Sequence, residues 1–244
     1  MNAETKWRKE NNMSYFIYKG ISSEDMGLKI TSMTPPQKAE QRSETLIVPG
    51  RSEPVFRTYD EYSSYNIDIS CIITDNSQQR KIFSWLSGNG KFIRSAEPDK
   101  YYTAKSCSLI SSTRISAEIR EFSISFECMP FAYAIENEPV IIMDSEGTID
   151  NNGSIPCEPV ITVEGNGYIE LNVNSEVWKL NDIDGSITID TPRNLAYKGN
   201  NVLLSKISRY DDNVYLPALN VGTNSISASG DVSKISVIKN ERWL

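Results

Sequence analysis

The sequence contains no histidine among its 244 residues. A Ser-His-Asp triad, a Cys-His nucleophile pair and a zinc site held by histidine are therefore excluded in this polypeptide. Basic residues are also few, with 25 Lys and Arg against 32 Asp and Glu, which gives a net charge of −7. Because phosphate binding relies on a basic surface, a protein that wraps nucleic acid fits this composition poorly. These absences favour a binding or structural protein over a common hydrolase.

Long apolar runs and cysteine motifs are missing as well. No stretch approaches the roughly 20 apolar residues of a membrane helix, so we expect no membrane association. The opening MNAETKWRKENN is polar and lacks the apolar region of a signal peptide, so we expect residues 1–12 to form a flexible extension. The cysteines show no CxxC or zinc-ribbon spacing, so we expect reduced structural thiols and neither a metal nor a cofactor. They are Cys71, Cys107, Cys128 and Cys157.

The first half reads mostly as short strands separated by turn residues. Apolar and polar residues alternate through 67–73 and most clearly through 121–128, which is the pattern of half-buried strands. Segments 27–33, 90–94 and 101–110 are further strand candidates, bounded by Gly, Pro, Ser and Asp. These segments predict a mainly β domain.

One segment, DNSQQRKIFSWLSGNG, predicts a helix over about 76–87. The run DNS supplies capping side chains, and Gly88 suits the left-handed stop of a helix. Ile82, Trp85 and Leu86 fall on one helical face. We expect this face to pack across the sheet; binding of a partner is the alternative that the amphipathic pattern leaves open.

The stretch 34–66 is irregular but rich in aromatic residues. Pro35-Pro36 disfavours a helix, and the VPGR tetrapeptide reads as a turn. Long loops inside compact domains are usually functional or disordered, and the aromatic content argues against plain disorder. We therefore predict an exposed arm or hairpin that touches a neighbouring subunit. The candidate interface residues are Val48, Pro49, Gly50, Arg51, Phe56 and Tyr59.

The second half is richer in Asn, Gly and Asp and shows no helix signal. Short strands at a spacing near ten residues predict an antiparallel β-sandwich. We place the boundary between the domains within 130–138, which gives an N-terminal domain at 13–133 and a C-terminal one at 134–244. The predicted strands are 159–163, 168–173, 186–190, 224–228 and 235–238, and the predicted turns are 164–167, 184–185 and 229–231.

No catalytic or metal site can be singled out. The acidic residues of the second half stand mostly in turn-like contexts, where capping and solvation explain them, so we expect no enzyme. The segment 181–185 lacks the terminal Glu of a calcium loop. Trp178 is a candidate for stacking on a sugar, although core packing is the interpretation we favour for a large aromatic residue in a small β-core.

The order of these features resembles the distal tail protein family of long-tailed phages. The likeness begins with MSYFIYKGISSEDMGLKI at Met13 and continues through the IVPGR loop at 47–51. It includes the helix that ends in GNG at 88–90 and the strand that closes at Pro130-Phe131. In the second half it covers PVI at 159–161, DGSITID at 184–190, residues 219–226 and the final RWL.

This resemblance implies a structural role in a virion tail. Members form a hexameric ring from an N-terminal β-barrel-like sheet with one helix, and carry a C-terminal galectin-like antiparallel β-sandwich. The ring joins the tail tube to the baseplate or tail tip, and DNA passes through it without specific binding. The implied partners are further copies of the chain, the tail tube protein, the tail-tip or baseplate hub protein and a receptor-binding protein. Such a protein is assembled in the cytoplasm of the bacterial host.

Two other classes remain open on the residues alone. A carbohydrate-binding module that recognises host cell-wall glycan would be a monomer that depends on Trp178. A cell-wall hydrolase would depend on one Asp or Glu. The helix and the aromatic arm of the first half fit neither class well.

Overall fold

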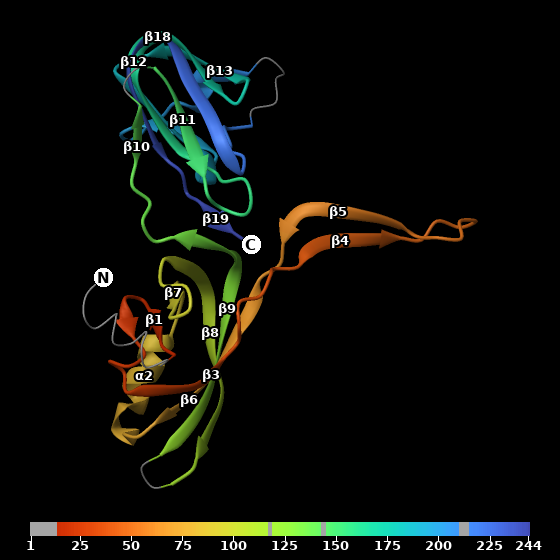
Figure 1. Ribbon diagram of the computed structural model, residues 1–244, viewed down its shortest axis with the longest axis vertical. Helices are drawn as coiled ribbons and strands as arrows, with labels where there is room; N and C mark the ends of the chain where they lie inside the picture. Colours follow the sequence, from red (N-terminus) through yellow and green to blue (C-terminus); the bar gives the residue numbers. More distant parts are fainter. Residues whose placement is uncertain (1–13, 117–118, 143–144, 210–214) are drawn as a thin grey trace. The chain divides into compact units, whose positions relative to one another are not determined.

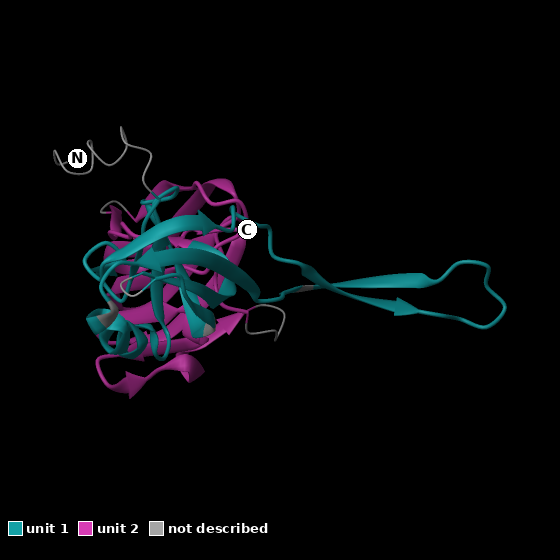
Figure 2. Cartoon of the chain, turned by 90° about the horizontal axis from the view of Figure 1, so that it is seen from below, with its two compact units in different colours: residues 1–132, 244 teal, residues 133–243 magenta. Residues whose placement is uncertain are grey.

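The computed structural model describes residues 14–116, 119–142, 145–209 and 215–244. The chain divides into two compact units (Figures 1 and 2). Unit 1 ends at Ala132, with Leu244 also assigned to it, and unit 2 spans Tyr133–Trp243. Within the described ranges, no helix is both long enough and apolar enough to cross a lipid bilayer.

Unit 1 is built on an antiparallel sheet whose strands follow the order β2-β1-β7-β8-β9-β6-β3. Strands β2 and β3 end this order, yet only the turn at 23–27 separates them in sequence. That turn spans at most about 22 Å, whereas a flat sheet of these strands would hold its ends roughly 29 Å apart. The sheet therefore curls, and the prediction of a barrel-like N-terminal sheet is confirmed. The bounds are β1 Phe16–Tyr18, β2 Ile21–Ser22, β3 Leu28–Met33, β6 Tyr65–Ile73, β7 Gly90–Arg94, β8 Lys100–Arg114 and β9 Arg120–Ala134.

The predicted helix is present and covers this sheet. It opens with a 3-10 turn, η1 (Asn76–Gln78), and continues as α2 (Gln79–Leu86). Its Trp85 ring stacks on Phe16 with centroids 5.5 Å apart, and the indole N–H donates to the Tyr18 carbonyl at 2.9 Å. Because Ile82 and Leu86 are buried beside Trp85, the apolar face of the helix is used for packing.

The core of unit 1 is aromatic. Phe16, Phe92 and Phe126 are fully buried and lie with ring centroids 4.8–5.6 Å apart. Burial of side chains of this size contributes about 1.5–3 kcal/mol each to folding. Cys71 and Cys128 are also buried, and burial raises the pKa of each thiol to about 12, so both behave as small apolar groups.

Unit 2 is an antiparallel sheet organised by two long strands, β12 and β18, which pair with each other. Strand β12 pairs with β14 through residues 160–164 and with β13 through 167–173. Strand β18 likewise pairs with β11 through 222–227 and with β10 through 235–237. Each long strand thus changes partners midway, which is how strands pass from one layer of a sandwich to the other.

The remaining strands and short helices of unit 2 surround these two. The strand bounds are β10 Val140–Ile142, β11 Glu146–Asn151, β12 Val160–Val173, β13 Glu176–Ile183, β14 Ser186–Asp190, β15 Leu195–Lys198, β16 Asn201–Val202, β17 Ile207–Arg209 and β18 Gly222–Ile238. Strand β19 (Arg242–Trp243) is not part of this sheet and pairs with β9. The 3-10 helices are η2 Thr191–Arg193 and η3 Leu204–Lys206. One apolar core cluster takes buried side chains from β10 to β18.

Two of the three predicted turns are wrong. Segments 164–167 and 229–231 lie inside β12 and β18, face each other and form a bulge where the register shifts. A Cβ on Gly165 would lie 2.2 Å from the Asp231 carbonyl oxygen, and one on Gly230 would lie 2.5 Å from that of Tyr168. The glycines serve close backbone approach at the bulge and not a reversal of the chain. The third turn, at 184–185, is confirmed, since it joins β13 to β14.

Candidate functional site

The stretch 34–66 contains a β-hairpin that stands apart from the larger sheet of unit 1. Strands β4 (Gln41–Leu46) and β5 (Val55–Tyr62) form a separate two-stranded antiparallel sheet. Figure 2 shows this hairpin leaving the rest of unit 1. Every residue of β4 is exposed. We call residues 41–62 the arm, and the prediction of an exposed hairpin is confirmed.

The stem of the arm is held by polar contacts between its own strands. Arg42 forms an ion pair with Glu61 at 2.6 Å, and the Tyr59 hydroxyl donates to Glu44 at 2.8 Å. The guanidinium groups of Arg42 and Arg57 lie 5.4 and 5.1 Å from the centroid of the Tyr59 ring. Because these groups are exposed to water, each contact contributes little to stability.

The same contacts shift two pKa values. The hydrogen bond to Glu44 holds the phenolic proton and raises the pKa of Tyr59 above its usual 10.0. The hydrogen bond and charge of Glu61 raise the pKa of Arg42 above its usual value. Tyr59 therefore keeps its proton, and Arg42 keeps its charge, throughout the physiological pH range.

The tip of the arm is apolar and uncovered. Ile47 is 86% exposed and Phe56 is 70% exposed, and Leu46 and Val48 are exposed as well. The backbone reverses at Gly50, which has φ +88°, and the Arg51 N–H donates to the Val48 carbonyl at 3.1 Å. Exposed apolar surface is a common feature of interaction sites.

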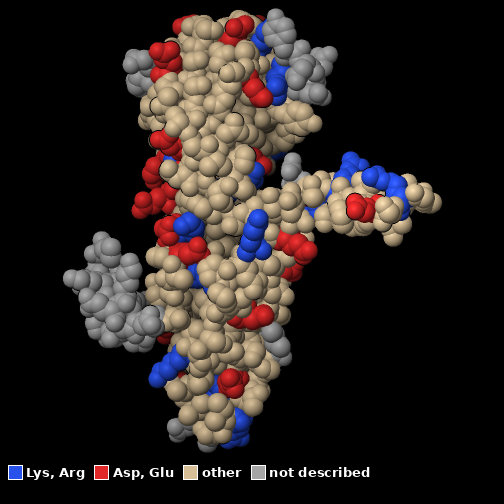
Figure 3. Space-filling view, turned by 45° about the vertical axis from the view of Figure 1, so that its right-hand side comes forward, with Lys and Arg blue, Asp and Glu red and all other residues tan. Residues whose placement is uncertain are grey.

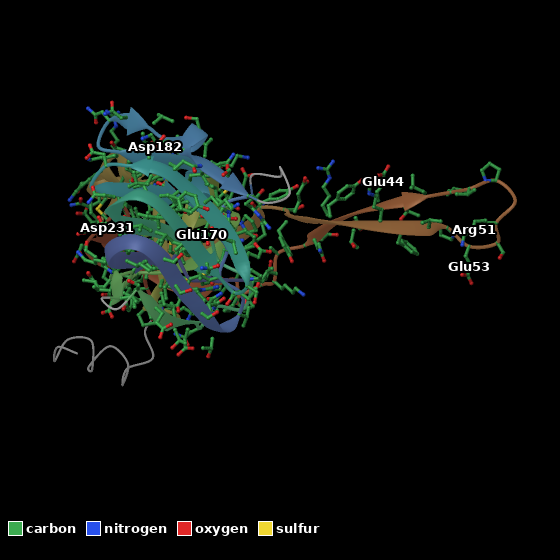
Figure 4. The ribbon with its side chains drawn as sticks, turned by 90° about the horizontal axis from the view of Figure 1, so that it is seen from above. Glu44, Arg51, Glu53, Glu170, Asp182 and Asp231 are labelled. Carbon is green, nitrogen blue, oxygen red and sulfur yellow. The ribbon has the colours of Figure 1, made fainter. Side chains whose placement is uncertain are left out.

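Charges of both signs accompany this apolar surface. Figure 4 shows Arg51 and Glu53 at the far end of the arm, with Glu44 on the stem. On the face drawn in Figure 3, the arm carries basic and acidic side chains beside uncharged surface. The arm therefore presents exposed apolar side chains together with charges of both signs.

The base of the arm is tied to the sheet of unit 1. The Ser63 N–H donates to the Glu40 carbonyl at 2.9 Å, which closes the two ends of the hairpin. Ser64 donates to Glu127 of β9 at 3.0 Å, and Lys105 of β8 forms an ion pair with Glu127 at 2.8 Å. The hydrogen bond from Lys105 is the main cause that lowers the pKa of Glu127. The base is thus anchored while the tip is uncovered.

All six residues predicted for a subunit interface lie in the arm. Val48, Pro49, Gly50 and Arg51 form the turn, and Phe56 lies beside it on β5. Tyr59 lies further down the stem, where its hydroxyl is used inside the hairpin. The prediction omitted Leu46 and Ile47, although the unbroken apolar run LIVP before the turn glycine was a signal for them.

The structure does not support Trp178 as a glycan contact. The side chain is 1% exposed and belongs to the core cluster of unit 2. Its indole N–H donates to the Tyr215 carbonyl at 2.8 Å, and the Arg209 guanidinium lies 5.1 Å from its ring. A buried indole has no face on which a sugar can stack, so core packing is the role that the structure gives it. Across the described residues, no group of three or more His, Cys, Asp and Glu side chains is placed to hold a metal.

The chain is similar to phage tail proteins. Residues 11–129 match the family model described as phage tail protein N-terminal domain. The crystal structure of the Dit protein (gp 19.1) of phage SPP1 is similar in fold, with a TM-score of 0.71 at 11% sequence identity. That similarity covers 95% of this chain and 99% of the SPP1 chain, so it includes both units. The SPP1 protein is described as a paradigm of the hub adsorption apparatus in phages that infect Gram-positive bacteria. No curated protein sequence matches the chain.

Proposed function

We propose that this chain, whose residues 11–129 match a model of phage tail proteins and whose fold is similar to that of the SPP1 Dit protein, is a distal tail protein that forms a hexameric ring in a virion tail. The ring joins the tail tube to the baseplate or tail tip and anchors the components that recognise the host. Its partners are the other copies of the chain, the tail tube protein, the tail-tip or baseplate hub protein and a receptor-binding protein. It assembles in the cytoplasm of the infected bacterium.

The exposed apolar tip of the arm is the main observation that supports assembly of the chain into a ring. Folding of the chain leaves Ile47 and Phe56 in water, although each side chain would gain about 1.5–3 kcal/mol from full burial. A partner surface is needed to obtain that free energy. When the partner is another copy, the tip meets a different part of that copy, and a head-to-tail contact repeated by rotation closes into a ring.

The charge of the chain suits passage of DNA through such a ring. With a net charge of −7 per copy, acidic groups outnumber the phosphate-binding basic groups of the ring overall. DNA that meets a neutral or acidic channel releases few counterions and binds weakly, so it can slide. Specific recognition of the DNA is not part of the proposed role.

Native mass measured by light scattering at two protein concentrations tests the ring. We expect a closed hexamer, or two stacked hexamers, for the wild-type chain. Ile47→Ser and Phe56→Ser should shift the mass towards monomer, because the apolar tip loses what it contributes to the contact. Val202→Ser is the matched control, since Val202 is an exposed apolar residue of unit 2, at 65% exposure. A wild-type chain that stays monomeric at both concentrations contradicts the proposal.

The alternative function, binding of glycan, finds no support at the residue that the sequence suggested for it. Trp178 was its candidate contact, and that side chain is buried.

A further inference from the structure

A hollow lies along the last strand of the sheet in unit 1. Strand β3 ends the strand order and pairs with β6 alone among the described strands. The hollow beside it has a volume of about 660 Å³, within the range of about 300–1,000 Å³ typical of binding sites. The residues that line it include Glu24, Leu28, Lys29, Ile30, Thr31 and Thr74.

We infer that this hollow receives the arm tip of a second copy of the chain. The inference rests on the proposed ring and names the surface that takes the arm. The tip and the hollow both belong to unit 1, yet Ile47 at the tip is 86% exposed. A second copy can supply a hollow to the arm tip and an arm tip to the hollow.

The two surfaces match in their apolar chemistry. Ile47 and Val48 offer branched side chains on a narrow turn, and Ile30, which is half-buried, supplies apolar surface to the hollow. Strand β3 has one edge that no described strand pairs with, so extended backbone leading to the tip can add to it by main-chain hydrogen bonds. Side-chain burial and strand addition then act at the same contact.

The two surfaces also match in charge. The tip carries one basic and one acidic side chain, Arg51 and Glu53, which Figure 4 shows at the end of the arm. The hollow is lined by one acidic and one basic side chain, Glu24 and Lys29. One orientation brings both pairs of opposite charge together, and the reverse places like charges together. Such an arrangement selects the orientation in which the tip enters.

The contact is head-to-tail, because the arm and the hollow are different surfaces. Every copy provides one arm and accepts one arm, so a closed ring leaves neither surface unused. An open chain of copies leaves one arm and one hollow exposed at its ends. Closure is therefore favoured over a chain of the same number of copies.

Cysteine cross-linking tests the contact directly. Ile47→Cys and Thr31→Cys are combined in a Cys107→Ser background, since the other three native cysteines are fully buried. Mild oxidation with diamide should then produce a ladder of covalent oligomers that ends at the hexamer. Each single variant should give no ladder. Ile47→Cys combined with Val202→Cys, which places the second thiol at an exposed site of unit 2, should give none either.

Native mass of the same samples under reducing conditions separates this inference from the ring itself. Hexamers without a ladder overturn docking in the hollow and leave the ring standing. A chain that stays monomeric and forms no ladder overturns both.

A charge exchange provides a second measurement. Lys29→Glu or Glu53→Lys alone should weaken assembly a few-fold, because like charges then meet. The double variant should restore it. A double variant as weak as the sum of the single variants contradicts the assignment of this pair.

Discussion

The body of unit 1 and its arm use antiparallel pairing in two different ways. In the body, β6 places Ile67, Ile69 and Ile73 in a core where each is fully buried or nearly so. In the arm, β4 has no buried residue, and its apolar residue Leu46 is exposed to water. A two-stranded hairpin is marginally stable by itself, so the arm lacks a source of stability that the body has. The difference fits the proposed function, in which the body provides the stable fold and the arm provides the contact with another copy.

The largest effect should come from emptying the aromatic core. Phe126→Ala removes a ring packed on Phe16 and Phe92 and should lower the free energy of unfolding by about 3–5 kcal/mol. Phe56→Ala, the matched change in the arm, should alter it by less than about 0.5 kcal/mol. Urea unfolding of the dilute monomer measures both. Equal losses for the two variants would break the comparison.

A second substitution tests whether the stability of unit 2 depends on its bulge, as the stability of the body depends on its aromatic core. Gly165→Ala places a Cβ 2.2 Å from the Asp231 carbonyl oxygen and should lower the free energy of unfolding by about 3 kcal/mol. Gly167→Ala is the control, because its Cβ would have no atom within 4 Å and only the φ of +75° opposes it, which costs about 1–2 kcal/mol. Thermal unfolding followed by circular dichroism compares them. A smaller loss at Gly165 than at Gly167 would show that the close approach is not needed.

A third comparison sets a buried amide side chain of unit 2 against an exposed amide side chain of the arm. Asn224 is 0% exposed, and its amide donates to the carbonyls of Asn220 and Gly222 at 2.8 Å, so Asn224→Ala should lower the free energy of unfolding by about 1–3 kcal/mol. Gln41 of the arm donates to the Tyr59 carbonyl in an exposed position, and Gln41→Ala should change it by less than about 0.5 kcal/mol. Urea unfolding measures the difference between them. Similar values would mean that burial does not separate the two regions.

The smallest effect concerns the pH dependence of the stem. The pKa of Tyr59 is raised in the folded arm, so the contact with Glu44 is present below the pKa of free tyrosine and is lost as pH rises through the folded value. Carbon-13 NMR of the Tyr59 ring should show titration above 10.0, the usual value. Glu44→Gln removes the carboxylate and should return the pKa towards 10.0. An unchanged pKa in that variant would mean that the stem contact does not persist in solution.

Local patterns in the sequence predicted the parts of the fold that depend on neighbouring residues. The alternation at 121–128 predicted β9, and the apolar face with its stop at Gly88 predicted α2, because both signals repeat over a few residues. The exposed hairpin followed from the VPGR turn and the aromatic content of 34–66. The resemblance to distal tail proteins is supported by the family and structure matches.

The features that the sequence did not predict depend on contacts between residues far apart along the chain. Glycine with Asn and Asp is typical of turns and of bulges alike, so the turns predicted at 164–167 and 229–231 became a shared bulge once β12 paired with β18. The hollow beside β3 joins residues from 14 to 74 along the chain, and no local pattern connects them. Trp178 shows the same limit, since an indole can stack on a sugar or fill a core, and only its neighbours choose between the two.

Removal of the arm is the most direct test of the account. The Ser63 N–H lies 2.9 Å from the Glu40 carbonyl oxygen, so a short Gly-Ser linker can replace residues 41–62 without moving the strands of the body. Native mass spectrometry of both proteins then measures assembly. The account predicts a hexamer of 27.5 kDa chains for the wild type and a folded monomer for the armless protein. An armless protein that assembles like the wild type would contradict the claim that the arm closes the ring.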